Sequence, residues 1–215
     1  MIRNVNKSNR IKVKPHIRLQ PYFVALARKL VAWRKDQDRM DDGGVAVGVT
    51  SSQQKSGCST VALNLAIALA DLTGQPVLFL ETEHRPNGLS RRLKRSDCGL
   101  NELLQGREST SKCIYETNHE SLFLLPPGNA SGKAMSALPV EALDSLVPEI
   151  LSNFSYLIAD LPVATPESVT FPVLERMDGA VLVKSGQSMD LPLNRVVRSL
   201  RQSGTPIIGL VLNKT

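Results

Sequence analysis

The chain has 215 residues, 42% of them hydrophobic, which suits one domain with a substantial core. Its formal net charge of +6 is uneven, because residues 1–40 carry eleven Lys or Arg and two Asp, whereas the remainder sums to −3. No apolar run reaches the roughly 20 residues of a membrane span, and the polar, basic start does not resemble a secretory signal, so we expect a cytoplasmic protein.

The N-terminal region predicts two segments before the main domain. Residues 1–18 lack periodicity and are interpreted as a flexible basic arm, and residues 19–44 as a helix and linker. The helix, expected over 21–34, carries an apolar stripe of Phe23, Leu26, Ala27 and Leu30. The stripe suits the protein's own core, which we favour, or a membrane surface. Residues 1–40 also suit contact with an anionic membrane, and a solvated tail is an equal alternative.

From residue 45 the pattern changes to short apolar strands that alternate with helices. We expect strands at 45–50, 76–80, 121–125, 156–159, 179–183 and 206–212, and helices at 59–72, 140–151, 166–176 and 191–202. Nearly continuous apolar strands separated by helices predict an α/β fold with three layers, α/β/α, around a mainly parallel sheet. We assign residues 45–215 to this domain.

The loop after the first of these strands carries the strongest chemical signal. A phosphate-binding loop needs glycines that turn backbone N–H groups inward, a Lys that reaches the phosphates, and a Ser or Thr for Mg²⁺. Cys58 stands where the Lys belongs, and Lys55 replaces an earlier glycine. The cofactor-binding candidates here are Ser52, Lys55, Gly57, Cys58, Ser59 and Thr60.

The cysteines and histidines do not add a second site. Cys58, Cys98 and Cys113 have neither the number nor the spacing of a disulfide set or a metal-ligand pair. We therefore expect free thiols in a reducing compartment.

The loop and its surroundings resemble the CpsD/CapB-type bacterial tyrosine kinases, whose loop usually reads Ser-Ser-x-x-Pro-Gly-Glu-Gly-Lys-Ser-Thr before an Asn-Leu-Ala helix. Residues 50–52 and 64–66 match on either side. Residues 77–86 are similar to the family's second acidic motif, and 157–162 to its Walker B strand. Further matches are 99–106, 124–128 and 209–213. The resemblance implies a P-loop NTPase-like fold with ATP and Mg²⁺ as cofactors. The altered positions in the loop and in the acidic motif argue against tight binding of these cofactors.

The same resemblance implies roles for particular residues. Glu81 and Glu83 take the two Asp positions of the acidic motif, and with Asp160 they are the catalytic candidates. Ser59 and Asp160 would contact the metal, and Asn213 joins the nucleotide-binding candidates. The family's Glu-x-x-Arg-x-x-Arg ring motif would fall near Pro21, Val24 and Ala27, which do not match it.

Three functions stay open. The first is a non-catalytic or weakly catalytic regulator of capsule or exopolysaccharide synthesis and export, bound to a membrane-bound polysaccharide copolymerase and so held at the inner face of the membrane. The second is an active tyrosine kinase or ATPase that uses Lys55. The third is a ParA/MinD-like ATPase whose basic arm binds DNA or membrane. Nucleic acid is not favoured as a partner, and a homo-oligomer is left open.

Overall fold

A central β-sheet organises the chain in the computed structural model, which describes residues 6–14, 20–36, 43–83, 88–92, 98–129, 139–165, 168–186 and 190–213. The strands are β1 (Asn6–Ile11), β2 (Val45–Ser51), β3 (Val77–Glu81), β4 (Tyr115–Thr117), β5 (Leu122–Leu125), β6 (Tyr156–Asp160), β7 (Gly179–Ser185) and β8 (Ile207–Asn213). They form one eight-stranded sheet in the order β1-β4-β5-β3-β6-β2-β7-β8. Only β4 and β5 pair antiparallel, so the expected mainly parallel sheet is confirmed.

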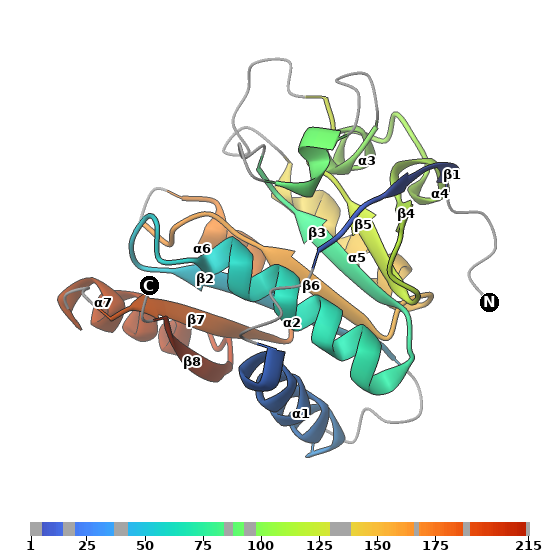
Figure 1. Cartoon of the computed structure of the whole chain (residues 1–215). Coiled ribbons are helices and arrows are strands. Elements are labelled where there is room, and N and C mark those ends of the chain that lie inside the picture. Colours follow the sequence, from blue (N-terminus) through green and yellow to red (C-terminus); the bar gives the residue numbers. More distant parts are fainter. Residues whose placement is uncertain are drawn as a thin grey trace.

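Helices cover both faces of this sheet (Figure 1). They are α1 (Gln20–Asp36), α2 (Cys58–Thr73), α3 (Leu100–Leu104), α4 (Thr110–Cys113), α5 (Leu143–Leu151), α6 (Thr170–Leu174) and α7 (Asp190–Gln202), with 3₁₀ turns at Leu89–Arg92 and Val140–Ala142. Alternate residues of β2 join two different cores, because side chains alternate across a strand. Val47 packs with α1 and α2, whereas Ala46 packs with α5, α6 and α7. The three expected layers are therefore present.

The helix α1 belongs to the folded core. Phe23, Ala27 and Leu30 of its predicted stripe are buried in the core formed with α2. At its far end the Arg34 guanidinium donates a 2.9 Å hydrogen bond to the carbonyl oxygen of Gly43 and lies 5.0 Å from the centroid of the Tyr156 ring. The stripe is thus covered by the protein's own side chains, as favoured, and does not form a membrane-facing surface.

The expectation of a flexible arm over residues 1–18 is wrong for Asn6–Ile11, which forms β1 at one edge of the sheet. This strand pairs in parallel with β4, and Ile11 and Val13 are buried. The Val13 N–H donates to the side-chain oxygen of Asn118. Because an edge strand is held by backbone hydrogen bonds on one side only, it needs no alternating apolar pattern, and the sequence gives no periodic signal. Residues 1–5 and 15–18 of the expected arm lie outside the described residues.

Several other elements differ from the prediction, and the short helices α3 and α4 were not expected at all. The short strand β4, which runs against the direction of its neighbour β5, was not expected. The helix expected over 166–176 is confined to Thr170–Leu174, and residues 166 and 167 lie outside the described part. The helix expected over 140–151 begins as the 3₁₀ turn Val140–Ala142. Short elements of this kind carry too few residues for a periodic signal.

Candidate functional site

The loop between β2 and α2 lies at the carboxyl edge of the sheet, where ligands bind in open parallel sheets. Two of its residues have left-handed backbone conformations, Lys55 with φ 59° and Gly57 with φ 82°. A side chain makes this conformation unfavourable by about 1–2 kcal/mol. Lys55 therefore keeps the backbone turn that a glycine would make more easily, and its side chain is exposed.

The thiol of Cys58 is directed into the protein. Cys58 is the first residue of α2 and is 6% exposed, and its Sγ donates a 3.4 Å hydrogen bond to the carbonyl oxygen of Val49 in β2. The side chain thus joins the start of the helix to the end of the strand. It supplies no positive charge to the loop, which is what a Lys at this position would do.

The last strand also contacts the loop. The Asn213 side-chain amide donates a 3.0 Å hydrogen bond to the carbonyl oxygen of Ser56, although the two residues are 157 positions apart. A Cβ atom at Gly57 would lie 2.1 Å from the Asn213 Nδ2, so a side chain at this position would require Asn213 to move. The structure therefore brings Asn213, a predicted candidate, into contact with the loop.

Ser56 is a loop residue that sequence reasoning did not single out. It is 2% exposed, and within the described residues its Oγ has no hydrogen-bond partner. A buried hydroxyl without a partner is costly, and a polar ligand of the loop would remove that cost. The signal in the sequence was a hydroxyl residue inside a glycine-containing loop, next to Gly57.

The carboxylates predicted for catalysis separate into three environments. Asp160, 4% exposed, ends β6 in register with Val49 of β2 on one side and Glu81 of β3 on the other. Glu81 accepts hydrogen bonds from the backbone N–H groups of Leu89, at 2.6 Å, and Ser90, at 2.9 Å. Both oxygens of Glu81 thus hold the following 3₁₀ turn. Glu83 is exposed, and residues 84–86 of the acidic motif lie outside the described part.

The hydroxyl residues of the loop, Ser52, Ser59 and Thr60, suit contact with a phosphate group better than the binding of a metal ion without a phosphate. Ser52 and Ser59 are half-buried, Thr60 is exposed, and Thr60 and Ser59 lie in the first turn of the 16-residue helix α2. The N-terminus of a helix attracts anions through its dipole and its N–H groups. No group of three or more His, Cys, Asp or Glu gathers for a metal in the described residues, so Ser59 and Asp160 would need ligand oxygens to complete a Mg²⁺ shell.

The structure also describes the state of the cysteines and the character of the helices. Cys58, Cys98 and Cys113, all within the described residues, form no disulfide. Burial raises the pKa of the Cys113 thiol, and its neighbour Cys98 raises it further. Among the described residues, none of the helices combines the length and the apolar composition of a membrane span.

Comparisons with known proteins agree with this geometry. Tyrosine-protein kinase CpsD of Streptococcus pneumoniae serotype 4 is 25% identical over 171 residues, which are 78% of this chain and 75% of that protein. The kinase domain of Escherichia coli tyrosine kinase ETK superposes with a TM-score of 0.73 at 22% identity, over 89% of this chain and 75% of that one. The septum site-determining protein MinD of Pyrococcus horikoshii, complexed with Mg-ADP, superposes with a TM-score of 0.66 at 22% identity, over 79% of this chain and 70% of that one. No family model matches the chain.

The parallel sheet, the loop after β2 and the helix that follows it have the fold of P-loop NTPase-like domains such as MinD. The motif order and the relatives at 25–26% identity make the chain similar to the CpsD-type tyrosine-protein kinases.

Proposed function

We propose that this chain is a tyrosine kinase-like regulator of capsule or exopolysaccharide synthesis and export that retains a phosphate-binding loop but transfers phosphate weakly or not at all. The observation that carries the proposal is Cys58, which stands in place of the lysine and whose thiol is turned inward to the carbonyl oxygen of Val49. Loss of one preorganised electrostatic contact lowers a rate on the order of 10²–10³-fold.

The positions of other side chains support the same proposal. Glu81 uses both carboxylate oxygens to hold the backbone of Leu89 and Ser90. Of the three tyrosines, Tyr115 and Tyr156 are buried, and Tyr22 is 74% exposed. A kinase that phosphorylates its own copies needs accessible tyrosines, and among the described residues Tyr22 is the one tyrosine that meets that condition.

Retained binding, as opposed to turnover, is supported by the loop itself. The left-handed positions Lys55 and Gly57, the helix N-terminus of α2 and the buried Ser56 hydroxyl make a polar, turned backbone that suits phosphate oxygens. Residues that would hold ATP are Ser52, Lys55, Gly57, Ser59, Thr60 and Asn213, and Mg²⁺ would lie between Ser59 and Asp160. The partner, by family resemblance, is a membrane-bound polysaccharide copolymerase, which would hold the protein at the inner face of the membrane.

The test is calorimetric titration with ATP and Mg²⁺ of the wild type, of Cys58→Lys and of Lys112→Ala, an exposed lysine on α4 that serves as the control. We expect weak binding in the wild type and in the control, and binding at least about tenfold tighter in Cys58→Lys, because a lysine contributes a charge-assisted contact. Circular dichroism checks that Cys58→Lys is folded. Unchanged affinity in a folded Cys58→Lys would show that the loop is not a nucleotide site.

The second candidate, an active kinase or ATPase, rests on the exposed Lys55 in the loop. It requires Mg²⁺-dependent ATP turnover that disappears in Lys55→Ala, with phosphate transfer to Tyr22 if the activity is a kinase activity. A wild type without turnover removes this candidate. The third, a ParA/MinD-like ATPase, requires the basic residues of 1–18 to retain DNA or vesicles, and replacement of the exposed Lys12 and Lys14 by Gln without a change in retention counts against it.

A further inference from the structure

The two edges of the sheet have opposite character. At one edge β1 reads Asn-Lys-Ser-Asn-Arg-Ile, and at the other β8 reads Ile-Ile-Gly-Leu-Val-Leu-Asn. Proteins protect edge strands with charged residues, prolines and bulges, because the unpaired backbone groups of an edge invite another strand. β1 has two of these charges. β8 has none, and its register shift lies at its start, between the partners of Ala180 and Val181.

On its outer side β8 pairs with no strand in the part of the chain that the structure describes, where β7 is its one strand neighbour. In a parallel ladder every second residue directs its N–H and C=O groups away from the neighbouring strand. The seven residues of β8 thus offer an unpaired row of donors and acceptors. A long, apolar and unprotected edge of this kind is either covered by another segment or prone to aggregate.

Side chains beside this edge are apolar and exposed. Leu210 is 56% and Leu212 is 51% exposed, although both belong to a strand of the core sheet. Leu210 lies in register with Leu182 of β7, which packs in the same core as α7, so the two leucines are on the α7 face of β8. The covering segment therefore needs apolar side chains on that face.

Both flanking helices carry exposed basic residues, and this positive charge favours an acidic segment over a basic one. On α7 the buried Leu193, Val196 and Leu200 face the core, and three arginines, Arg195, Arg198 and Arg201, are exposed on the other side.

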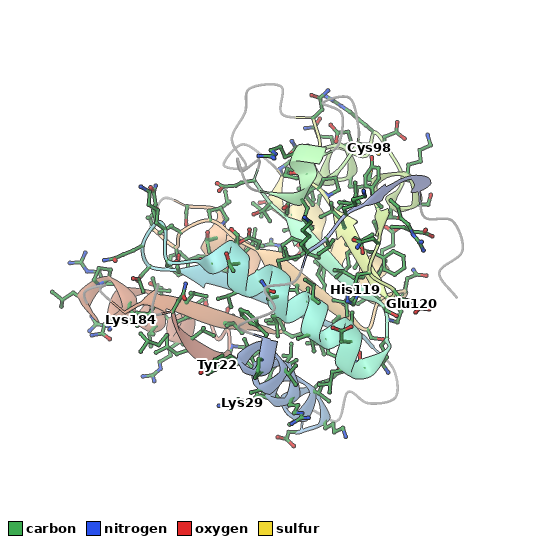
Figure 2. The ribbon with its side chains drawn as sticks, viewed as in Figure 1. Tyr22, Lys29, Cys98, His119, Glu120 and Lys184 are labelled. Atoms are coloured by element: carbon green, nitrogen blue, oxygen red, sulfur yellow. The ribbon has the colours of Figure 1, made fainter. Side chains whose placement is uncertain are left out.

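On α1, Leu26 lies 3.9 Å from a Cβ position at Gly209 of β8. Tyr22 and Lys29 share the helix face of Leu26 at four- and three-residue spacing, and both are exposed. Figure 2 shows them on the side of the molecule where β8 lies.

We propose that the open edge of β8 accepts an extended, acidic and alternately apolar segment of another protein as an additional strand. A second copy of this chain would bring the basic α1 and α7 against their own counterparts, and like charges disfavour that pairing. A lipid surface could contact the exposed leucines and arginines. It offers no regularly spaced hydrogen-bond partners for the unpaired N–H and C=O groups of β8, whereas another strand does. This inference does not depend on nucleotide binding by the loop.

The probe is a fluorescent synthetic peptide of alternating Val and Glu that matches β8 in length, titrated into the full chain and followed by anisotropy. Two control peptides change one property each. One has N-methyl groups on alternate residues, which removes the backbone donors, and the other carries Lys in place of Glu. We expect each control peptide to bind at least about tenfold more weakly, since several hydrogen bonds or charge contacts are lost together. Amide exchange over Ile207–Asn213 should slow when the Val-Glu peptide is bound.

Matched variants of the protein locate the site. Leu212→Lys and Lys29→Glu should each weaken binding about tenfold, whereas Leu72→Lys, at an exposed leucine on α2, and Arg107→Glu, after α3, should leave it unchanged. All four positions are exposed or half-exposed, so the variants should fold. Equal binding of the N-methylated peptide, or equal loss in the control variants, would overturn the proposal. So would retention on anionic vesicles without peptide binding, or a wild-type dimer that Leu212→Lys converts to a monomer.

Discussion

The Asn213 side-chain amide donates a hydrogen bond to the carbonyl oxygen of Ser56, and it thereby ties the end of the edge strand β8 to the candidate phosphate loop. The same side chain fills the space beside Gly57 where a Cβ would otherwise lie. One residue thus links the edge where we propose a partner to the site where we propose a nucleotide. A change in the position of β8 would therefore move or break the hydrogen bond between the Asn213 amide and the Ser56 carbonyl oxygen in the loop.

Gly57→Ala should destabilise the protein by about 1–3 kcal/mol, since the new Cβ meets Asn213 and the backbone is left-handed. Urea unfolding measures the change. Gly74→Ala is the control, because Gly74 is also left-handed, with φ 62°, but a Cβ there has no atom within 4 Å. Adding Asn213→Ala to Gly57→Ala should recover the steric part of the loss. Equal costs for Gly57→Ala and Gly74→Ala would mean that the contact with Asn213 is absent.

Glu81→Gln should destabilise the protein by about 1–3 kcal/mol, because an amide NH₂ group cannot accept the hydrogen bond that a carboxylate oxygen accepts. Chemical unfolding gives the loss, and faster amide exchange at Leu89 and Ser90 locates it. Glu83→Gln is the matched change at an exposed position two residues away. If Glu81→Gln unfolds at the same denaturant concentration as Glu83→Gln, the carboxylate does not hold the turn.

Leu30→Ala should lower the free energy of unfolding by about 2–5 kcal/mol, since Leu30 is 1% exposed in the core between α1 and α2. Tyr22→Ala, on the exposed side of the same helix, should change it by less than about 0.5 kcal/mol. The comparison tests whether α1 is part of the cooperative fold. A small loss for Leu30→Ala would instead make α1 a separate segment that docks loosely.

Cys113 should make the protein less stable at alkaline pH. Its folded pKa is raised above the ordinary value by burial, so the folded state holds the proton more tightly than the unfolded state. The stabilisation is present below the unfolded pKa of about 8.5 and is lost as the pH rises above it. Stability between neutral pH and pH 10 should therefore fall more steeply in the wild type than in Cys113→Ala. Cys98→Ala should reduce this steepness in part, because Cys98 also raises the pKa of Cys113, and parallel curves for wild type and Cys113→Ala would contradict the prediction.

The parts of the fold that the sequence predicted are those with long, regular patterns. The strands from β2 onward, except for β4, and the helix α2 are marked by continuous apolar runs, and their observed ends differ from the predicted ones by a few residues at most. The edge strand β1 and the short β4 were missed, because backbone pairing with a distant segment holds them. Local sequence carries no record of such a partner.

For the candidate site too, some features could be predicted from the sequence and others could not. The positions of the loop and of Asp160 followed from motif order, and the structure places both at the carboxyl edge of the sheet. The contacts that individual side chains make could not be predicted from motif order. The carboxylate of Glu81 holds a turn, the thiol of Cys58 holds a strand end, and Ser56 is a buried hydroxyl, and each of these depends on neighbours that the fold alone determines.

The pairing of β1 with β4 has a consequence for the order in which the chain can fold. Asn6 is opposite Tyr115 and Ile11 opposite Thr117, so the partner of the first strand is synthesised more than one hundred residues later. At ribosomal speeds of about 5–20 residues per second, that delay is roughly 5–20 s. Throughout this time the first strand stays unpaired, and its polar composition keeps it from pairing with the wrong neighbour. β1 can therefore close its edge of the sheet only after β4 has emerged, and the central strand β6 is synthesised later still.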